Sequence, residues 1–217
     1  MLPVKTLIEK VKSVVRGIMY EVAKLLDLLT NGFIRAWHIT LLSLLGHGVI
    51  LLALVEADFI NAAILLIGFG LMDALDGALA RYQGTESLIG MLLDATTDRL
   101  KETLIYAGLA YYFVIVNQPL GALYSVVALG LSISVSYIKA KGEVALLEQA
   151  QAGGKRVKNI NRQLEVGIFG YEVRMLVLAV SFAVSQPYYG VIAVAAGSLL
   201  TLLIRSDEIT KRINDKS

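Results

Sequence analysis

Long apolar stretches are the feature that most constrains how this chain folds. A bilayer takes about 20 apolar residues in a helix, and several stretches meet that length or approach it. The last one, which ends at Ile204, is too long for one span, and Ser185-Gln186-Pro187 divides it because a proline does not continue a helix. The predicted spans are Ile39–Val55, Phe59–Ala80, Leu88–Val116, Leu120–Ile138, Val166–Ser185 and Tyr188–Ile204. The sequence therefore predicts an all-α integral membrane bundle of six transmembrane helices.

Composition supports a membrane protein and excludes several kinds of site. Hydrophobic residues make up 56% of the 217 residues and charged residues 18%, with a mean hydropathy of +0.67. Soluble domains have about 45–50% and about 25%, respectively. The chain has no cysteine and two histidines, which excludes disulfides, thiol nucleophiles and zinc–thiolate sites. A net charge of +2 gives no reason to expect a nucleic-acid partner.

The distribution of lysine and arginine predicts the orientation. Basic residues precede the first span and recur in alternate loops and in the tail, whereas the loops 56–58, 117–119 and 185–187 contain none. Positive charge marks the cytoplasmic side. We therefore expect a multi-pass protein of the cell membrane with both termini and the active site on the cytoplasmic side.

The first thirty residues follow a different pattern. Apolar residues from Val4 to Leu26 recur at helical spacing, and basic residues lie mostly on the other side. This favours an amphipathic juxtamembrane helix lying on the membrane surface; the alternative is a helix packed on a partner protein. The predicted organisation is residues 1–34 for this interfacial helix, 35–206 for the six-helix membrane domain and 207–217 for a cytoplasmic tail.

Four aspartates stand in or beside the second and third predicted spans. Asp73 and Asp76 are three residues apart, and Asp94 and Asp98 are four apart, so each pair shares one helix face. A short turn between the helices makes them antiparallel neighbours and can bring the four carboxylates together. Ionised carboxylates in a bilayer are costly unless they are paired or bind cations. Oxygen ligands without histidine or cysteine select Mg²⁺, Mn²⁺ or Ca²⁺, and four carboxylates suit two ions.

Two other interpretations of these carboxylates stay open. One is an intramembrane ion-pair network with Arg81, Arg99 and Lys101 as the cations. The other is a divalent-cation carrier, which would use the same aspartates; carriers tend to show inverted repeats and broken helices, and this sequence shows neither.

Residues 73–98 also resemble a known signature. They read Asp-x2-Asp-Gly-x2-Ala-Arg-x8-Gly-x3-Asp-x3-Asp, which is similar to the signature of the CDP-alcohol phosphotransferases at every fixed position. The resemblance implies an enzyme of phospholipid biosynthesis that transfers a phosphatidyl group from a CDP-linked lipid, CDP-diacylglycerol or an ether analogue, to an alcohol and releases CMP. A homodimer is predicted as well.

The resemblance also implies roles for single residues. Asp73, Asp76, Asp94 and Asp98 would hold two divalent cations, Mg²⁺ or Mn²⁺, and Asp98 would be the catalytic base. The implied CDP-lipid site consists of Asp73, Gly77, Ala80, Arg81 and Thr40.

A second segment bears on the acceptor alcohol. Residues 136–141, Ser-Tyr-Ile-Lys-Ala-Lys, resemble a segment of the phosphatidylinositol-phosphate synthases. The resemblance implies a phosphate-binding pocket for the acceptor made of Lys139, Lys141, Arg174 and Arg205. Such a pocket suits a phosphorylated alcohol, and inositol phosphate is the prediction; glycerol 3-phosphate is the alternative. Lys139, Lys141 and Arg205 can also be explained as basic side chains that reach the cytoplasmic interface.

Overall fold

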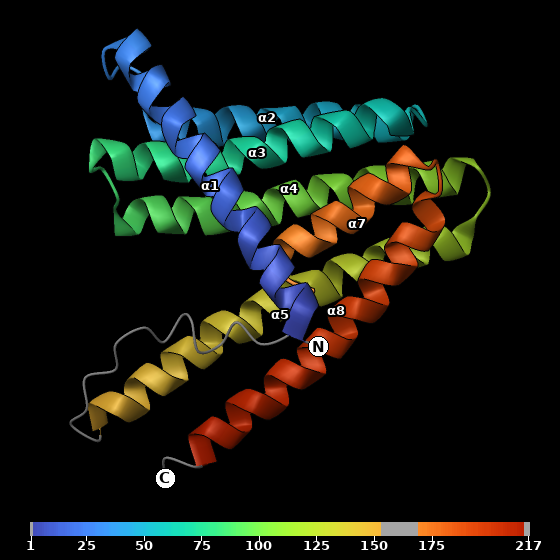
Figure 1. Cartoon of the computed structure of the whole chain (residues 1–217). Coiled ribbons are helices and arrows are strands. Elements are labelled where there is room, and N and C mark those ends of the chain that lie inside the picture. Colours follow the sequence, from blue (N-terminus) through green and yellow to red (C-terminus); the bar gives the residue numbers. More distant parts are fainter. Residues whose placement is uncertain (1, 153–168, 215–217) are drawn as a thin grey trace. The chain divides into compact units, whose positions relative to one another are not determined.

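The computed structural model describes residues 2–152 and 169–214, and in this part of the chain all regular secondary structure is α-helical (Figure 1). The all-α prediction is confirmed for these residues. The helices are α1 (Leu2–Thr30), α2 (Ala36–Val55), α3 (Phe59–Gln83), α4 (Leu88–Ile115), α5 (Pro119–Ala152), α7 (Tyr171–Ala183) and α8 (Pro187–Asn214).

The residues group into two compact units. The first unit comprises Met1–Leu52 and Ile64–Ile105, and the second comprises Ala53–Ala63 and Tyr106–Ser217. All four signature aspartates belong to the first unit, and all four predicted acceptor-binding cations belong to the second. Each unit is therefore described by itself.

Four of the described helices, α2, α3, α5 and α8, are long and apolar enough to cross a membrane. The predicted spans in 39–55, 59–80, 120–138 and 188–204 fall on these four. Helix α4 is long enough, but it carries five charged residues between positions 94 and 102. Helix α7 has only 13 residues. Six membrane crossings therefore stay a prediction.

In the second unit, three helix-to-helix turns share one backbone geometry. Ala57, Asn117 and Ser185 each adopt positive φ, at 60°, 58° and 53°. The residue after each donates its N–H to the carbonyl five residues back, at 2.7–2.8 Å. This is the bond that closes a Schellman motif at a helix C-terminus. Pro119 and Pro187 then open the next helices, where a missing N–H costs nothing. The predicted helix break at 185–187 is confirmed.

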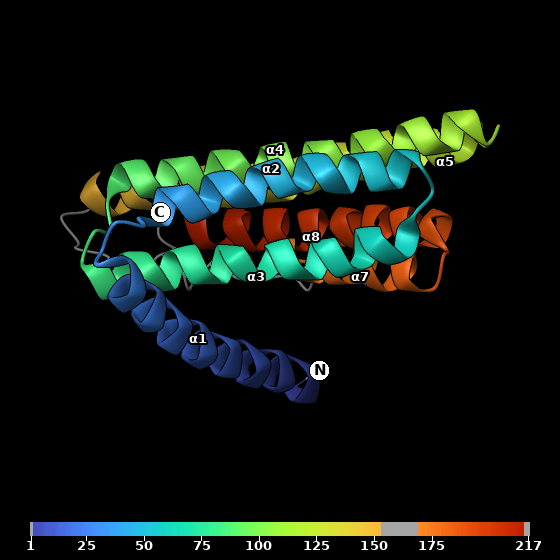
Figure 2. The same ribbon diagram turned by 90° about the horizontal axis from the view of Figure 1, so that it is seen from above.

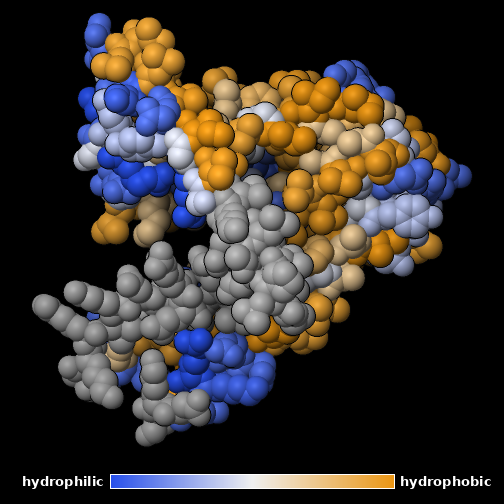
Figure 3. Space-filling model, viewed as in Figure 1, coloured by the Kyte–Doolittle hydropathy of each residue, from blue (hydrophilic) through white to orange (hydrophobic). Residues whose placement is uncertain are grey.

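In the first unit, α2 and α3 lie side by side and approach closely at Gly46. A side chain at this position would collide with the ring of Phe69 on α3. Small residues permit such contacts between membrane helices. Leu41, Leu45 and Val49 of α2 are exposed. Figure 3 shows hydrophobic residues along the sides of the helices and hydrophilic residues towards their ends, a pattern typical of a membrane-embedded surface.

Helix α1 is anchored to the rest of the first unit through its C-terminal part. Ala23 is fully buried in a small core with Ile39, Ala78 and Leu79. The side-chain amide of Gln83 donates to Asp27 Oδ1 at 2.6 Å and to the carbonyl of Ile34 at 2.9 Å. Figure 2 shows α1 diverging from α3 towards the N-terminus. The predicted helix is confirmed, and its position on a membrane surface stays a prediction.

In the second unit, α5 extends well beyond the predicted span. The apolar stretch ends at Ile138, but the helix continues to Ala152. Its extension packs on α8 through Leu146 and Ile209, and the Gln149 amide donates to the carbonyl of Ile213 at 2.8 Å. Packing against α8 thus stabilises a polar helix end that hydropathy does not predict.

Candidate active site in the signature helices

The carboxylate pairs of α3 and α4 differ in exposure. Asp76 is buried, Asp73 and Asp98 are largely covered, and Asp94 is exposed. Both helices belong to the first unit over this range. The spacings of three and four residues keep each pair on one helix face. An ion pair between Lys101 and Asp73 joins α3 to α4, and hydrogen bonds from α2 fix the carboxylates of α3.

Asp73 is held by one of its two oxygens. Its Oδ1 accepts a hydrogen bond from Ser43 Oγ on α2 at 2.9 Å and lies 2.5 Å from Lys101 Nζ on α4. Its Oδ2 is buried, and no group among the described residues donates a hydrogen bond to it. A buried carboxylate oxygen without a donor is costly. The arrangement therefore presents one carboxylate oxygen that a cation could bind.

Asp76 is oriented by Thr40, which lies on α2. Thr40 Oγ1 donates to Asp76 Oδ2 at 2.6 Å, and both residues are buried. We predicted Thr40 for the CDP-lipid site. Its hydroxyl lies against a proposed metal ligand, so it also fixes the rotamer of that carboxylate.

An ion-pair network follows Asp98 along α4. Lys101 Nζ lies 3.9 Å from Asp98 Oδ1 as well as 2.5 Å from Asp73 Oδ1. Arg99 lies 2.5 Å from Glu102 and 3.7 Å from Asp98. Two of the three cations in the alternative ion-pair network therefore do pair with carboxylates. Of these two, Lys101 contacts both signature pairs.

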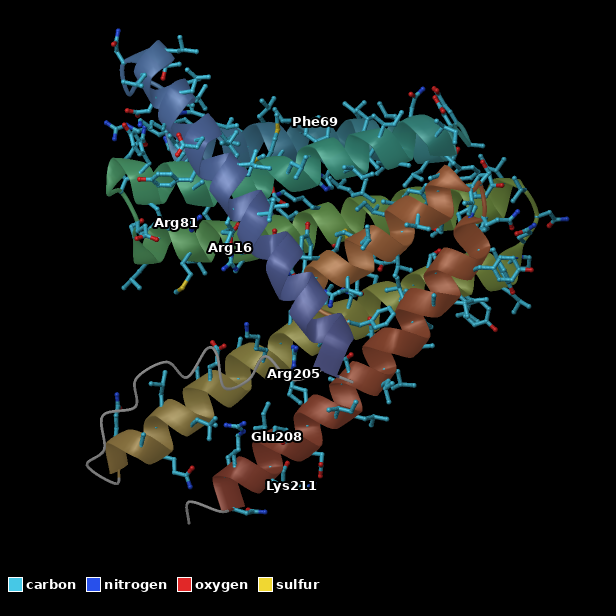
Figure 4. All side chains as sticks on the ribbon, viewed as in Figure 1. Arg16, Phe69, Arg81, Arg205, Glu208 and Lys211 are labelled. Carbon is cyan, nitrogen blue, oxygen red and sulfur yellow. The ribbon has the colours of Figure 1, made fainter. Side chains whose placement is uncertain are left out.

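The small residues of the signature lie where α3 ends. The guanidinium of Arg81 folds back over Gly77: a Cβ at that glycine would lie 3.4 Å from Arg81 Nη1. Figure 4 labels Arg81 at the end of α3 that precedes the turn to α4. Ala80, one residue earlier, is half-buried. Arg81 is exposed and thus accessible to an anionic group.

The donor set fits a hard divalent cation by its chemistry. Four carboxylates with no histidine or cysteine among them are the ligands that Mg²⁺ and Mn²⁺ prefer, and Asp73 Oδ2 is a buried oxygen without a donor. Among the described residues, however, no three acidic or histidine side chains converge closely enough to hold an ion as they stand. For an ion to bind, the carboxylates would have to move closer together.

The predicted acceptor-binding arginines are buried in the second unit. Arg174 on α7 is 1% exposed and donates from Nη1 to the carbonyl of Phe169 at 3.0 Å. Arg205 on α8 donates from Nη1 to the carbonyl of Val135 on α5 at 2.8 Å; Figure 4 shows it between these helices. The N–H of Phe169 in turn donates to Thr201, one turn before Arg205. Both guanidinium groups are therefore fixed by backbone carbonyls on connected segments.

The two predicted lysines are more exposed than the arginines. Lys139 lies 3.9 Å from Glu143 Oε1, and its side chain is about one third exposed. Lys141 is exposed and lies 5.9 Å from the centre of the Tyr137 ring. Both remain predictions for the acceptor pocket. Their surroundings differ from those of the buried arginines.

Comparison with known proteins identifies the family. A family model described as CDP-alcohol phosphatidyltransferase matches residues 33–203. The chain belongs to the CDP-alcohol phosphatidyltransferase family. The prediction of a phosphotransferase of phospholipid biosynthesis is thereby confirmed.

Two of the similar proteins are named as synthases of inositol phosphate lipids. The chain is 32% identical to a phosphatidylinositol phosphate synthase of Corynebacterium glutamicum over 160 residues, which is 73% of this chain and 69% of the relative. It is also 32% identical to an archaetidylinositol phosphate synthase of Methanothermobacter thermautotrophicus, over 54% of this chain and 57% of the relative.

Solved structures share the fold. The phosphatidylinositol phosphate synthase of Mycobacterium tuberculosis, with CDP-DAG bound, superposes with a TM-score of 0.70 at 24% identity, covering 88% of this chain and 93% of the other. The same enzyme has been solved with manganese and citrate. This agrees with the prediction of a divalent cation.

Sequence reasoning missed two residues that contact the signature aspartates. Ser43 had no role in the prediction, and Lys101 entered only as a partner in the alternative ion-pair network. The spacing of three residues from Asp98 to Lys101 was the available signal for Lys101. For Ser43 no signal existed, because its partner Asp73 lies 30 residues away.

Proposed function

We propose that this protein transfers a phosphatidyl-type group from a CDP-linked lipid to inositol phosphate and releases CMP. The observation that carries the proposal is the complete signature from Asp73 to Asp98 on two helices joined by an ion pair. Family membership supports the reaction class. The names of the relatives support the acceptor.

The carboxylates would hold two divalent cations, Mg²⁺ or Mn²⁺, through Asp73, Asp76, Asp94 and Asp98. When bound, these ions supply positive charge that neutralises the diphosphate of the donor and stabilises the departing CMP. Thr40 keeps Asp76 in one orientation. Ser43 and Lys101 engage Asp73 through Oδ1 alone.

The side chains near the end of α3 would bind the donor. The backbone at Gly77 and the small side chain of Ala80 leave space for the nucleotide diphosphate. Arg81, folded over Gly77 and exposed, can bond a phosphate oxygen with two N–H donors. Asp73 and Thr40 complete the proposed CDP-lipid site.

The chemical step would be a substitution at the phosphorus that bears the lipid. The acceptor hydroxyl oxygen forms a bond to that phosphorus, and the bond to the bridging oxygen breaks, so CMP leaves with the electron pair. Asp98 accepts the hydroxyl proton as the general base. The side chain of Asp98 is 19% exposed, so a substrate can reach it.

The acceptor phosphate would bind Arg174 and Arg205, with Lys139 and Lys141 near the interface. Arginine presents planar pairs of donors that match a phosphate, and its side chain stays charged when buried. Glycerol 3-phosphate is the second candidate, because it is also a small phosphorylated alcohol. A neutral acceptor would give such a group of cations no role.

The deciding experiment measures CMP release from CDP-diacylglycerol by the purified full chain. Mn²⁺ or Mg²⁺ is added or chelated, and inositol phosphate, glycerol 3-phosphate, free inositol or no acceptor is supplied. Metal-dependent release that is fastest with inositol phosphate supports the proposal. Faster release with glycerol 3-phosphate would show that this compound, and not inositol phosphate, is the acceptor. Metal transport without any release of CMP would favour a cation carrier.

We further propose six membrane crossings, a homodimer, and an active site open to the cytoplasm. Positive charge before the first span and in alternate loops supports the orientation. Single cysteines at Gln83, Gln118 and Gln186 test it in sealed vesicles, because the chain contains no other cysteine. An impermeant thiol reagent should label Gln83→Cys only from the cytoplasmic face and the other two only from outside. Labelling of Gln83→Cys from outside contradicts the orientation.

A further inference from the structure

Lys101 is a buried cation that the proposed mechanism does not require. Its side chain has no exposed surface, although an ammonium group is strongly hydrated in water. A buried charge needs a partner of opposite sign. Asp73 Oδ1 at 2.5 Å and Asp98 Oδ1 at 3.9 Å provide two, one from each signature pair.

The charge of Lys101 also reaches the rest of the carboxylate site. It interacts electrostatically with Asp76, Asp94 and Asp98. Arg99, the other cation nearby, acts on Asp94 and Asp98, but its guanidinium lies 2.5 Å from Glu102 and its side chain is 26% exposed. Lys101 is therefore the more deeply buried of these two counter-charges, and it is the one in direct contact with Asp73.

The contact with Asp73 has a definite geometry. Lys101 and Ser43 both engage Oδ1, whereas Oδ2 is buried without a donor among the described residues. A carboxylate fixed through one oxygen presents the other in a defined direction. Lys101 thus acts on Asp73 in two ways, by orientation and by charge.

We propose that Lys101 is a positioning residue that serves as a permanent counter-cation of the metal site. It fixes Asp73 so that Oδ2 faces a divalent ion, and its charge lowers the affinity of the carboxylates for that ion. The inference rests on the proposed function, because it takes these aspartates as metal ligands. It goes beyond that function because it proposes that a residue outside the signature sets how tightly the carboxylates bind the ion.

The sign of the effect follows from Coulomb's law. A fixed positive charge a few ångströms from a divalent ion opposes binding of that ion, strongly so where water is excluded. Without the ion, the same charge stabilises four carboxylates that otherwise repel one another. Removal of the charge should therefore tighten metal binding and lower the stability of the metal-free protein against unfolding.

The test measures Mn²⁺ binding and thermal unfolding of the full chain in detergent micelles. For Lys101→Met, we expect a dissociation constant for Mn²⁺ at least about ten-fold lower than that of the wild type. The unfolding midpoint in chelator should fall by several degrees, since a buried carboxylate loses its partner. A merely structural role would lower stability and metal affinity together. Unchanged or weaker Mn²⁺ binding overturns the proposal.

Three further variants separate charge from orientation. Lys101→Gln is smaller and neutral but can still donate to Asp73, so it should also bind Mn²⁺ more tightly, and it replaces the methionine variant if that one does not fold. Lys101→Arg keeps the charge and should stay within about three-fold of the wild type. Ser43→Ala removes a neutral hydrogen-bond donor from Asp73 Oδ1. This variant should also change the Mn²⁺ affinity by less than about three-fold, because Lys101 still holds Asp73. Equal tightening in Ser43→Ala and Lys101→Met contradicts a role for the charge.

The outcome can be told apart from failure of the proposed function. A wild type that releases CMP with Mn²⁺, combined with unaltered Mn²⁺ affinity in Lys101→Gln, rejects only the role of Lys101. A wild type that binds no Mn²⁺ rejects both the metal site and this inference.

Discussion

Two aspartates of the first unit, Asp73 and Asp76, and two arginines of the second, Arg174 and Arg205, are charges largely removed from solvent, and their contacts differ. Asp73 and Asp76 are held by side chains, Ser43, Lys101 and Thr40. Arg174 and Arg205 each donate to a backbone carbonyl. One substitution can therefore release a carboxylate, whereas no side-chain substitution removes the two carbonyls that accept hydrogen bonds from the arginines.

The difference has a consequence for function. A carboxylate has only acceptor sites, so a partner on one oxygen leaves the other for a cation. A guanidinium has five donors and no acceptor, so it can bond backbone carbonyls and still carry the positive charge that attracts an anion. The first unit is thus suited to hold cations in an adjustable arrangement. The second is suited to present fixed positive charge to an anion.

Loss of a signature carboxylate should have the largest effect. Asp98→Asn removes the proposed base and a proposed metal ligand together, and Asp94→Asn removes a ligand. General-base catalysis alone contributes about 10²- to 10⁴-fold, so CMP release should fall at least that far in Asp98→Asn. The measurement is CMP release with each variant reconstituted in vesicles. Near-normal turnover of Asp98→Asn would show that Asp98 is neither the general base nor a required metal ligand.

Loss of a buried arginine should act on the acceptor rather than on the donor. Arg174→Gln would lose the proposed charge-assisted contact with the acceptor phosphate, and such a contact is worth about 1.5–3 kcal/mol, or roughly ten- to a hundred-fold in affinity. The KM for inositol phosphate should rise by that factor, with the KM for the CDP-lipid nearly unchanged. Thermal unfolding without substrate checks that the fold persists. A raised KM for the lipid alone would assign Arg174 to the donor.

Loss of an orienting hydroxyl should have an intermediate effect. Thr40→Val keeps the shape of the side chain and removes the hydrogen bond to Asp76, a bond to a charged group worth about 1.5–3 kcal/mol. The Mn²⁺ concentration that gives half-maximal CMP release should rise about ten-fold. Thr40→Ser, which retains the hydroxyl, is the matched control and should stay near the wild type. Equal behaviour of the two variants contradicts the orienting role.

Loss of an exposed lysine should have the smallest effect. Lys141 is exposed and lies near Tyr137, and contacts between exposed charges are worth about 0–1 kcal/mol. Lys141→Ala should therefore raise the KM for inositol phosphate by less than about five-fold. Arg174→Gln, measured in the same assay, provides the comparison. A larger effect in Lys141→Ala would show that the lysine, although exposed in the unit, is enclosed when substrate binds.

Much of the fold could be predicted because hydropathy and turn residues act locally. The apolar stretches located α2, α3, α5 and α8, and Pro187 marked the break between α7 and α8. The extension of α5 to Ala152 could not be predicted, since it depends on packing against Ile209 on α8, more than 60 residues away. The same holds for α1, whose amphipathic pattern was evident but whose anchoring through Gln83 and Asp27 was not.

The sequence by itself determined the family and the four carboxylates, because helix geometry turns spacings of three and four residues into shared faces. Only the tertiary structure decided which partners those carboxylates have. Ser43 and Thr40 come from a separate helix, and no local pattern connects them to Asp73 and Asp76. Lys101 is buried against Asp73 because two helices pack together there. Burial gives its charge an influence on the site that an exposed lysine would lose to water.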